Sequence, residues 1–137
     1  MSTHVKTAGE LFQKGYNCAQ AVFGAFCDET GIDFETAVKI AFSFGGGIGG
    51  MGDVCGAVSG MLMVLGVKYG YINPADKEAK SEHYRLVRDL VKRFETENGS
   101  IVCRELLERL KEKKCIPAAR PCAVLVENAA KILDEYI

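Results

Sequence analysis

A glycine cluster near the middle of the chain limits the possible folds more than any other feature of the sequence. The stretch SFGGGIGGMGDVCGAVSG, residues 43–60, contains seven glycines between positions 45 and 56. A few glycines would suffice for a tight connection between helices, because glycine adopts backbone angles that other residues rarely reach. The larger number indicates either a loop that binds phosphate or a backbone path packed closely beside a neighbouring group.

The spacing of these glycines fits the dinucleotide-binding pattern only in part. G-x-G-x-x-G occurs twice, beginning at Gly45 and at Gly47. Such a site also needs a preceding strand, a parallel sheet and an acidic residue about twenty positions later. The segment VKIAFSF alternates as a strand would, but the later stretch KYGYINPADKE leads into a helix, and no Gly-Lys-Ser/Thr follows the glycines. The pattern therefore disfavours a nucleotide site.

Capping residues and apolar periodicity predict helices along nearly the whole chain. The predicted helix starts, in chain order, are residue 3, Asn17, Asp33, Asp53, Asn73–Pro74, Ser100 and Pro121. The helix after Asp53 is apolar nearly all round, so we expect it to lie at the centre. The sequence predicts an all-α fold, a single compact bundle of about six or seven helices with a buried central helix. No linker divides the chain, so one domain is expected over residues 1–137.

Composition and charge disfavour several classes of function. The net charge of −1 gives no global attraction to nucleic acid or to an anionic membrane. The most apolar stretch, residues 54–67, is too short to span a membrane, and the N-terminus lacks the apolar core of a signal peptide. We expect a cytoplasmic protein, where the six cysteines are more often buried, metal-binding or catalytic than disulfide-bonded.

Four of the cysteines fall in the first turns of four different predicted helices. They are Cys18, Cys55, Cys103 and Cys122. Unpaired N–H groups and the helix dipole stabilise an anion there, so we expect a lowered thiol pKa. Thiolates bind soft metals and attack disulfides. No pair has the C-x-x-C spacing of zinc knuckles or the short runs of ferredoxins, which indicates a site assembled by the whole fold.

Three further residues are candidates beside this set. Cys27, late on the second predicted helix, is expected to be a core thiol. Cys115 lies in the basic loop KEKKC and is either a bystander or a resolving thiol. His83 lies on or near the inner stripe of the fifth predicted helix, where it donates to a cluster sulfur, replaces a ligand or simply packs. Gly56 and Gly60 share one helix face, which allows close approach of another backbone or of an inorganic cluster.

The residues around the four cysteines resemble those of a known family. The stretches GYNCAQAVF, FGGGIGGMGDVCGAVSGMLMVLG, NGSIVCREL and PCAVLVENAAKIL are similar to the four cysteine motifs of the C_GCAxxG_C_C family of small bacterial and archaeal redox-active proteins. The order here is Cys-Gly-Ala rather than the Gly-Cys-Ala of the family name. The resemblance covers nearly the whole chain and implies a redox-active cysteine protein, with iron–sulfur ligation expected of the four. Cys27 and Cys115 fall outside it.

Two functions of the same four cysteines therefore remain open. The first is binding of an iron–sulfur cluster for electron transfer or redox sensing, with a protein redox partner. The second is metal-free thiol–disulfide chemistry, which needs only one close pair and an exposed attacking sulfur. Either an oxidoreductase or a simple electron carrier fits these functions. A structural helical module is a third reading, and the apolar fourth helix leaves room for a homodimer.

Overall fold

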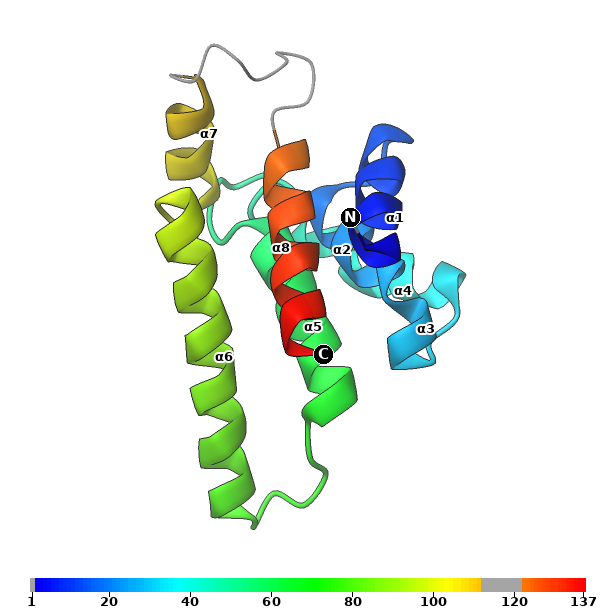
Figure 1. Ribbon diagram of the computed structural model, residues 1–137, viewed down its shortest axis with the longest axis vertical. Coiled ribbons are helices and arrows are strands. Elements are labelled where there is room, and N and C mark those ends of the chain that lie inside the picture. Colours follow the sequence, from blue (N-terminus) through cyan, green and yellow to red (C-terminus); the bar gives the residue numbers. More distant parts are fainter. Residues whose placement is uncertain (1, 112–121) are drawn as a thin grey trace.

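The computed structural model describes residues 2–111 and 122–137 (Figure 1). The regular secondary structure in these residues consists of helices joined by turns and loops, with one isolated antiparallel bridge between Val54 and Val102. The prediction of an all-α fold is confirmed. The elements are α1 (Thr3–Gln13), α2 (Cys18–Ala25), α3 (Cys27–Thr30), α4 (Phe34–Ala41), the 3-10 turn η1 (Phe42–Phe44), α5 (Gly56–Tyr69), α6 (Lys77–Asn98), α7 (Cys103–Lys111) and α8 (Ala123–Tyr136).

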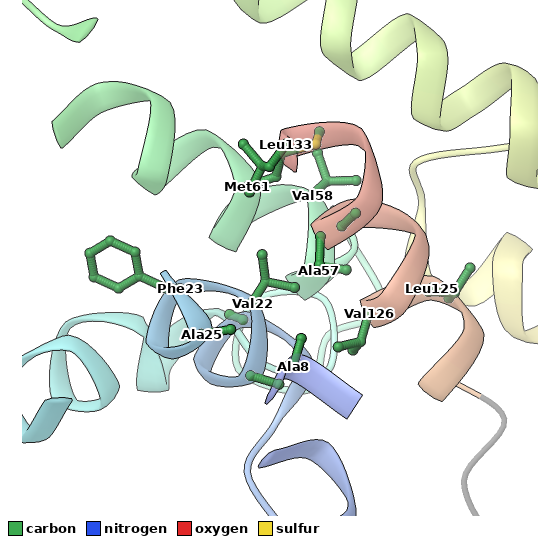
Figure 2. Close-up of a cluster of buried hydrophobic side chains, with 14 of the residues drawn as sticks. Ala8, Val22, Phe23, Ala25, Ala57, Val58, Met61, Leu125, Val126 and Leu133 are labelled. Carbon is green, nitrogen blue, oxygen red and sulfur yellow. The ribbon is translucent and has the colours of Figure 1, made fainter. Parts of the chain in front are cut away.

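The hydrophobic core lies mainly between α1, α2, α5 and α8. Figure 2 shows side chains from these helices converging, among them Val22 of α2, Met61 of α5 and Leu133 of α8, all fully buried. Burying one such side chain stabilises the fold by about 1.5–3 kcal/mol. The prediction of a buried central helix holds for most of α5, although its last turn reaches the surface at Val67 and Tyr69.

The two glycines on the inner face of α5 allow α2 to approach closely. A Cβ added at Gly60 would lie 2.8 Å from the carbonyl oxygen of Ala19, and one added at Gly56 would lie 3.0 Å from the amide nitrogen of Ala19. No ordinary side chain fits at the shorter of these separations. Close helix packing is therefore the reason for glycine at both positions.

Local capping signals predicted some helix starts correctly. Asn17 caps α2 in a capping box with Gln20, and the Asp33 side chain caps α4. The segment VKIAFSF is helical rather than extended, so the strand interpretation is wrong. The second predicted helix also breaks at Phe26, whose backbone leaves helical geometry between α2 and α3.

Three helices start later than predicted, because the predicted capping residue makes other hydrogen bonds. Asn73 accepts a hydrogen bond from the amide of Ala75, and α6 begins later, capped by Asp76. The backbone of Asp53 is bonded to the glycine loop and to Cys103, so α5 begins at Gly56. Ser100 accepts from the amide of Val102, and α7 begins at Cys103.

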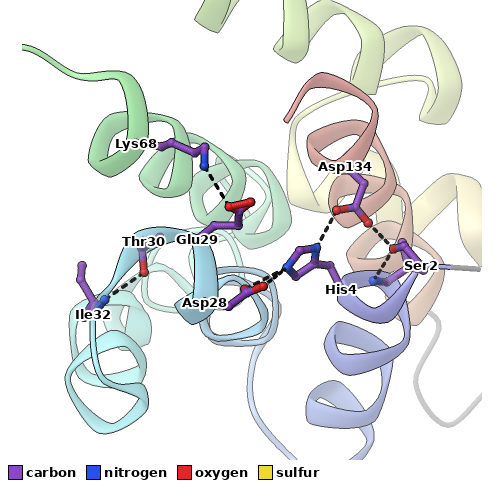
Figure 3. Close-up of polar contacts among 9 residues, drawn as sticks. Ser2, His4, Asp28, Glu29, Thr30, Ile32, Lys68 and Asp134 are labelled. Atoms are coloured by element: carbon purple, nitrogen blue, oxygen red, sulfur yellow. Dashed lines mark hydrogen bonds and ion pairs between the residues drawn. The ribbon is translucent and has the colours of Figure 1, made fainter.

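A histidine fastens α1 to two other helices. In Figure 3 the His4 ring lies between Asp28 of α3, at 2.8 Å from Nε2, and Asp134 of α8, at 2.7 Å from Nδ1. Ser2 also donates to Asp134, and the His4 ring stacks on Phe26 with a centroid separation of 4.2 Å. These contacts hold the N-terminal helix against the core.

The described helices also bear on membrane insertion. Within residues 2–111 and 122–137, none combines the length and the apolar content needed to cross a bilayer. The expectation of no membrane span is met for that part of the chain.

Candidate functional site

Each of the four predicted cysteines begins a different helix. Cys18 and Cys103 are the first residues of α2 and α7, and Cys55 and Cys122 are the residues immediately before α5 and α8. The predicted placement at helix starts is correct. Figure 1 shows that α5 and α8 run side by side in the same direction, which brings their starting ends to the same part of the molecule.

The fold brings these four residues together. The thiols of Cys18 and Cys122 are joined by a hydrogen bond, and Cys55 and Cys103 are close enough to act electrostatically on Cys18. Cys55 in turn interacts with Cys103 and Cys122. We call Cys18, Cys55, Cys103 and Cys122 the four-cysteine centre.

The glycine loop packs against this centre in a left-handed backbone conformation. Its φ angles are positive at Gly46, Gly47, Ile48, Gly49 and Gly50, and again at Gly52. The loop bonds to itself, as in the 2.9 Å contact from the Asp53 amide to the Gly47 carbonyl. A Cβ added at Gly47 would lie 2.6 Å from the Cβ of Cys103. The glycines therefore provide a backbone path packed beside the Cys103 side chain rather than a nucleotide cradle.

A short antiparallel bridge holds Cys55 and Cys103 next to each other. The amide of Cys55 donates to the carbonyl of Ile101 at 2.7 Å, and the amide of Cys103 donates to the carbonyl of Asp53 at 2.6 Å. Val54 and Val102 pair between these bonds. Sequence reasoning missed the bridge, although the repeated Val-Cys before α5 and α7 was a local signal, since β-branched residues favour extended backbone.

The pKa values of three thiols in this centre, those of Cys18, Cys55 and Cys103, are raised. Cys55 is 2% exposed, and its pKa rises to about 11 through desolvation, although the amides of Ala57 and Val58 lower it. The hydrogen bond to Cys122 raises the pKa of Cys18 far above its usual range, and burial adds to this. Burial and the neighbouring Cys122 also raise the pKa of Cys103.

The expected lowering of the thiol pKa is therefore wrong for Cys18, Cys55 and Cys103 in the metal-free protein. The helix-start amides act in the predicted direction at Cys55, but desolvation outweighs them. Several thiolates so close together would also repel one another. The raised pKa values favour neutral thiols at Cys18, Cys55 and Cys103, and a positive charge beside them would favour thiolates.

The other candidates lie elsewhere or outside the described residues. Cys27 is half-buried and begins α3, at the edge of the core rather than inside it. Cys115 lies outside the described residues. His83 lies beside Tyr69 and Tyr136, which end α5 and α8, whereas the cysteines stand at the starts of these helices. The 14 residues of α5 span about 20 Å, so His83 does not reach the sulfurs.

The centre differs from a site for a single metal ion. Across the described part of the chain, no group of three or more His, Cys, Asp or Glu side chains is arranged to hold one ion. Four sulfurs around one zinc ion would lie about 4 Å apart. In the described residues the four cysteines therefore lie near one another without the arrangement of a single-ion site.

Comparisons with known proteins place the whole centre inside one matched region. A family model described as "Putative redox-active protein (C_GCAxxG_C_C)" matches residues 16–136. An "Uncharacterized protein" of Archaeoglobus fulgidus is 27% identical over 132 residues, which cover 90% of this chain and 85% of that protein. No solved structure matches the chain.

Proposed function

The chain belongs to the C_GCAxxG_C_C family, and from this membership we propose that the four-cysteine centre holds an iron–sulfur cluster for electron transfer or redox sensing. The observation that carries the proposal is the convergence of four cysteine side chains, each from the start of a different helix. Thiolate sulfur is the usual ligand of such clusters. When bound, the cluster would supply one-electron chemistry, and a protein redox partner would exchange electrons with it.

The chemistry of the centre fits a cationic inorganic group. The raised thiol pKa values mean that the metal-free centre holds its protons, whereas bound metal deprotonates the thiols that ligate it. The glycine loop brings backbone, with no side chain at Gly47, against Cys103. Hydrogen bonds and limited solvent access around ligand sulfurs tune the potential of such a centre, and burial of Cys55 provides the second of these.

The hydrogen bond between Cys18 and Cys122 supports a second candidate function. Without metal, these two thiols would form one disulfide, passing two electrons and two protons to a partner disulfide that is reduced to two thiols. The attacking species must be a thiolate, and the raised pKa of Cys18 leaves Cys122 as the attacking sulfur of this pair. This chemistry uses only two of the four converging cysteines, so cluster binding is the preferred function.

Anaerobic purification, followed by an absorbance spectrum and by iron and sulfide analysis, tests the proposal. We expect a coloured protein with iron and sulfide in similar amounts, and a loss of most of the iron in Cys18→Ser and Cys55→Ser. Cys27→Ser is the matched control and should retain full iron. A colourless, iron-free protein that cycles between a Cys18–Cys122 disulfide and two thiols would overturn the cluster proposal and support the second candidate.

A further inference from the structure

Four exposed apolar side chains gather on the glycine loop and on the 3-10 turn that precedes it. They are Phe42, Phe44, Ile48 and Met51, of which Phe42 and Met51 are 68% and 70% exposed. Backbone hydrogen bonds hold them in one compact unit, since the amide of Ile48 donates to Phe44 and the amide of Met51 donates to Ile48. Single exposed apolar side chains are ordinary, whereas a group of them marks an interaction surface. We call these four residues the loop patch.

Ile48 occupies a position in the loop that glycine would fill at lower cost. Its φ of 66° is left-handed, a conformation that glycine adopts freely and a β-branched residue adopts only under strain. In residues 2–111 and 122–137, every other residue with a positive φ is a glycine. The side chain of Ile48 is 39% exposed and lies outside the hydrophobic core, so burial within the chain does not offset the strain. Burial against a partner would offset it.

The charge of the loop patch suits a second copy of the same chain. No residue from position 42 to position 52 has an ionisable side chain. Two copies related by a two-fold axis present the same surface to each other, so an uncharged patch meets itself without repulsion. Homodimer interfaces are also more apolar than other protein surfaces. A transient encounter with a different protein is instead steered by charge, which the patch lacks.

Two residues of opposite charge border the patch. The side chains of Asp53 and Arg104 are both exposed, and neither makes an ion pair within the part of the chain that the structure describes. Arg104 lies beside the loop, because its guanidinium donates to the carbonyl of Gly52 at 3.4 Å. Across a two-fold axis, a contact from Asp53 to Arg104 of the partner subunit occurs twice. The rim of the patch is therefore complementary to itself in charge.

We propose that the loop patch is the interface of a homodimer. The apolar side chains of the patch are buried against those of the second copy, and Asp53 pairs with Arg104 of the partner subunit. The interface lies on the glycine loop rather than on the apolar α5, most of which is already buried in the fold. Because the loop packs on Cys103 at Gly47, the interface lies over the four-cysteine centre. Dimer formation does not require a cluster there, so this inference is independent of the proposed redox function.

Sedimentation velocity of the full chain in the metal-free, reduced state tests the proposal. We expect a reversible monomer–dimer equilibrium with a dissociation constant of about 1–100 μM. Phe42→Ser and Met51→Ser should each raise that constant by about tenfold or more. Ile72→Ser is the matched control, since Ile72 is 98% exposed but lies outside the patch, and it should leave the constant unchanged. A monomer at every concentration, or an equal effect of Ile72→Ser, would overturn the proposal.

The variant Ile48→Gly separates association from folding. It removes an apolar side chain from the patch and also relieves the left-handed strain. We expect the dissociation constant to rise by about tenfold. The denaturation midpoint, measured at a concentration where the chain is monomeric, should stay unchanged or rise. A lower midpoint would show that Ile48 serves the fold, and would contradict the proposal.

Two charge-reversal variants test how the copies are oriented. Asp53→Arg and Arg104→Glu should each raise the dissociation constant of the homodimer by about fivefold, because like charges then meet at the rim. An equimolar mixture of the two variants should form a heterodimer more tightly than either variant forms a homodimer, since opposite charges face each other again. Absence of this preference would overturn the two-fold arrangement. Native helical circular dichroism verifies that each variant is folded.

Discussion

Gly47 shows how a single backbone position shapes the four-cysteine centre. It has a φ of 72°, and an added Cβ would lie 2.6 Å from both the Cβ of Cys103 and the amide nitrogen of Asp53. Gly49, two residues later, has a φ of 55° but nothing within 4 Å of the same position. A side chain at either position would be strained by the left-handed backbone, but only one at Gly47 would also collide with neighbouring atoms.

Replacing each of these glycines by alanine separates strain from overpacking. Gly49→Ala should destabilise the metal-free protein by about 1–2 kcal/mol, the cost of a left-handed alanine. Gly47→Ala should cost about 2–4 kcal/mol, because overpacking against Cys103 is added to that strain. Guanidinium denaturation under reducing conditions measures both values. Equal losses in the two variants would show that the Cys103 contact relaxes freely.

The thiols of the centre should differ in reactivity from the thiol at the edge of the core. With a pKa of about 11, the Cys55 side chain is a thiolate in roughly one protein molecule in a thousand at pH 8. The side chain is also almost wholly buried. In the reduced, metal-free protein we expect iodoacetamide to alkylate Cys27 well before Cys55, as read by peptide mass spectrometry. The Cys55 rate should rise about tenfold per pH unit up to pH 10. Alkylation of Cys55 at the rate of Cys27 would contradict the burial argument.

At the scale of the helices, close packing of α2 on α5 depends on which face of α5 a glycine occupies. Gly60 faces Ala19 of α2, whereas an added Cβ at Gly66 would meet nothing within 4 Å. We expect Gly60→Ala to destabilise the protein by about 1–3 kcal/mol through overpacking. The same change at Gly66 should stabilise it by about 0.5–1 kcal/mol, because alanine is the better helix former. Denaturant midpoints measure both changes in stability. If the two substitutions change the stability in the same direction, the packing argument is refuted.

The contact of α1 with α3 and α8 should depend on pH through His4. Burial lowers the pKa of His4, but the hydrogen bonds that its ring donates to Asp28 and Asp134 outweigh burial, so the net pKa is raised above 6.5. A raised folded-state pKa gives stability that is fully present below about pH 6.5 and is lost as pH rises through the folded value. The melting temperature of wild type minus that of His4→Gln should therefore shrink between pH 6 and pH 9. A constant difference would show that His4 acts by packing on Phe26 alone.

The helix starts show which parts of the fold are predictable from sequence. The caps at Asn17 and Asp33 were predicted because each is completed by residues three positions away. Asp53 and Ser100 have equally good capping side chains, but the antiparallel bridge between their segments draws the backbone into extended pairing and delays both helices. That pairing joins residues about fifty positions apart, so no local pattern contained it.

At the scale of the whole molecule, the grouping of the four cysteines followed from one repeated local feature, their place at helix starts. Their charge state did not follow. The sequence gives the amides of a helix start, but desolvation and the neighbouring thiols depend on the complete fold, and these reverse the expected direction of the pKa shift. The pKa of a side chain is therefore predictable from its local sequence only where residues from distant parts of the chain do not bury it or lie beside it.

Binding of a cluster in the four-cysteine centre should stabilise α7 more than the other helices. This helix is held mainly by Leu106 and Leu110 on one face and by the backbone bonds around Cys103. Loading with iron and sulfide should slow amide hydrogen exchange in α7 by about tenfold or more, because a ligand that binds only the folded state adds to its stability. Cys103→Ser should abolish that protection. Unchanged exchange in α7 after loading would exclude Cys103 as a ligand.

The bridge between Val54 and Val102 couples two of the four cysteines, Cys55 and Cys103, through the backbone, and leaves Cys18 and Cys122 outside this coupling. Cys55 and Cys103 lie on two paired backbone segments. They must move together, since the amide of each is bonded to the chain segment that carries the other. Cys18 and Cys122 arrive on α2 and α8, two helices that pack against each other, and their thiols meet where those helices begin. We therefore expect the spacing of Cys55 and Cys103 to be fixed by the backbone pairing of their own segments, and the spacing of Cys18 and Cys122 to follow the packing of α2 on α8.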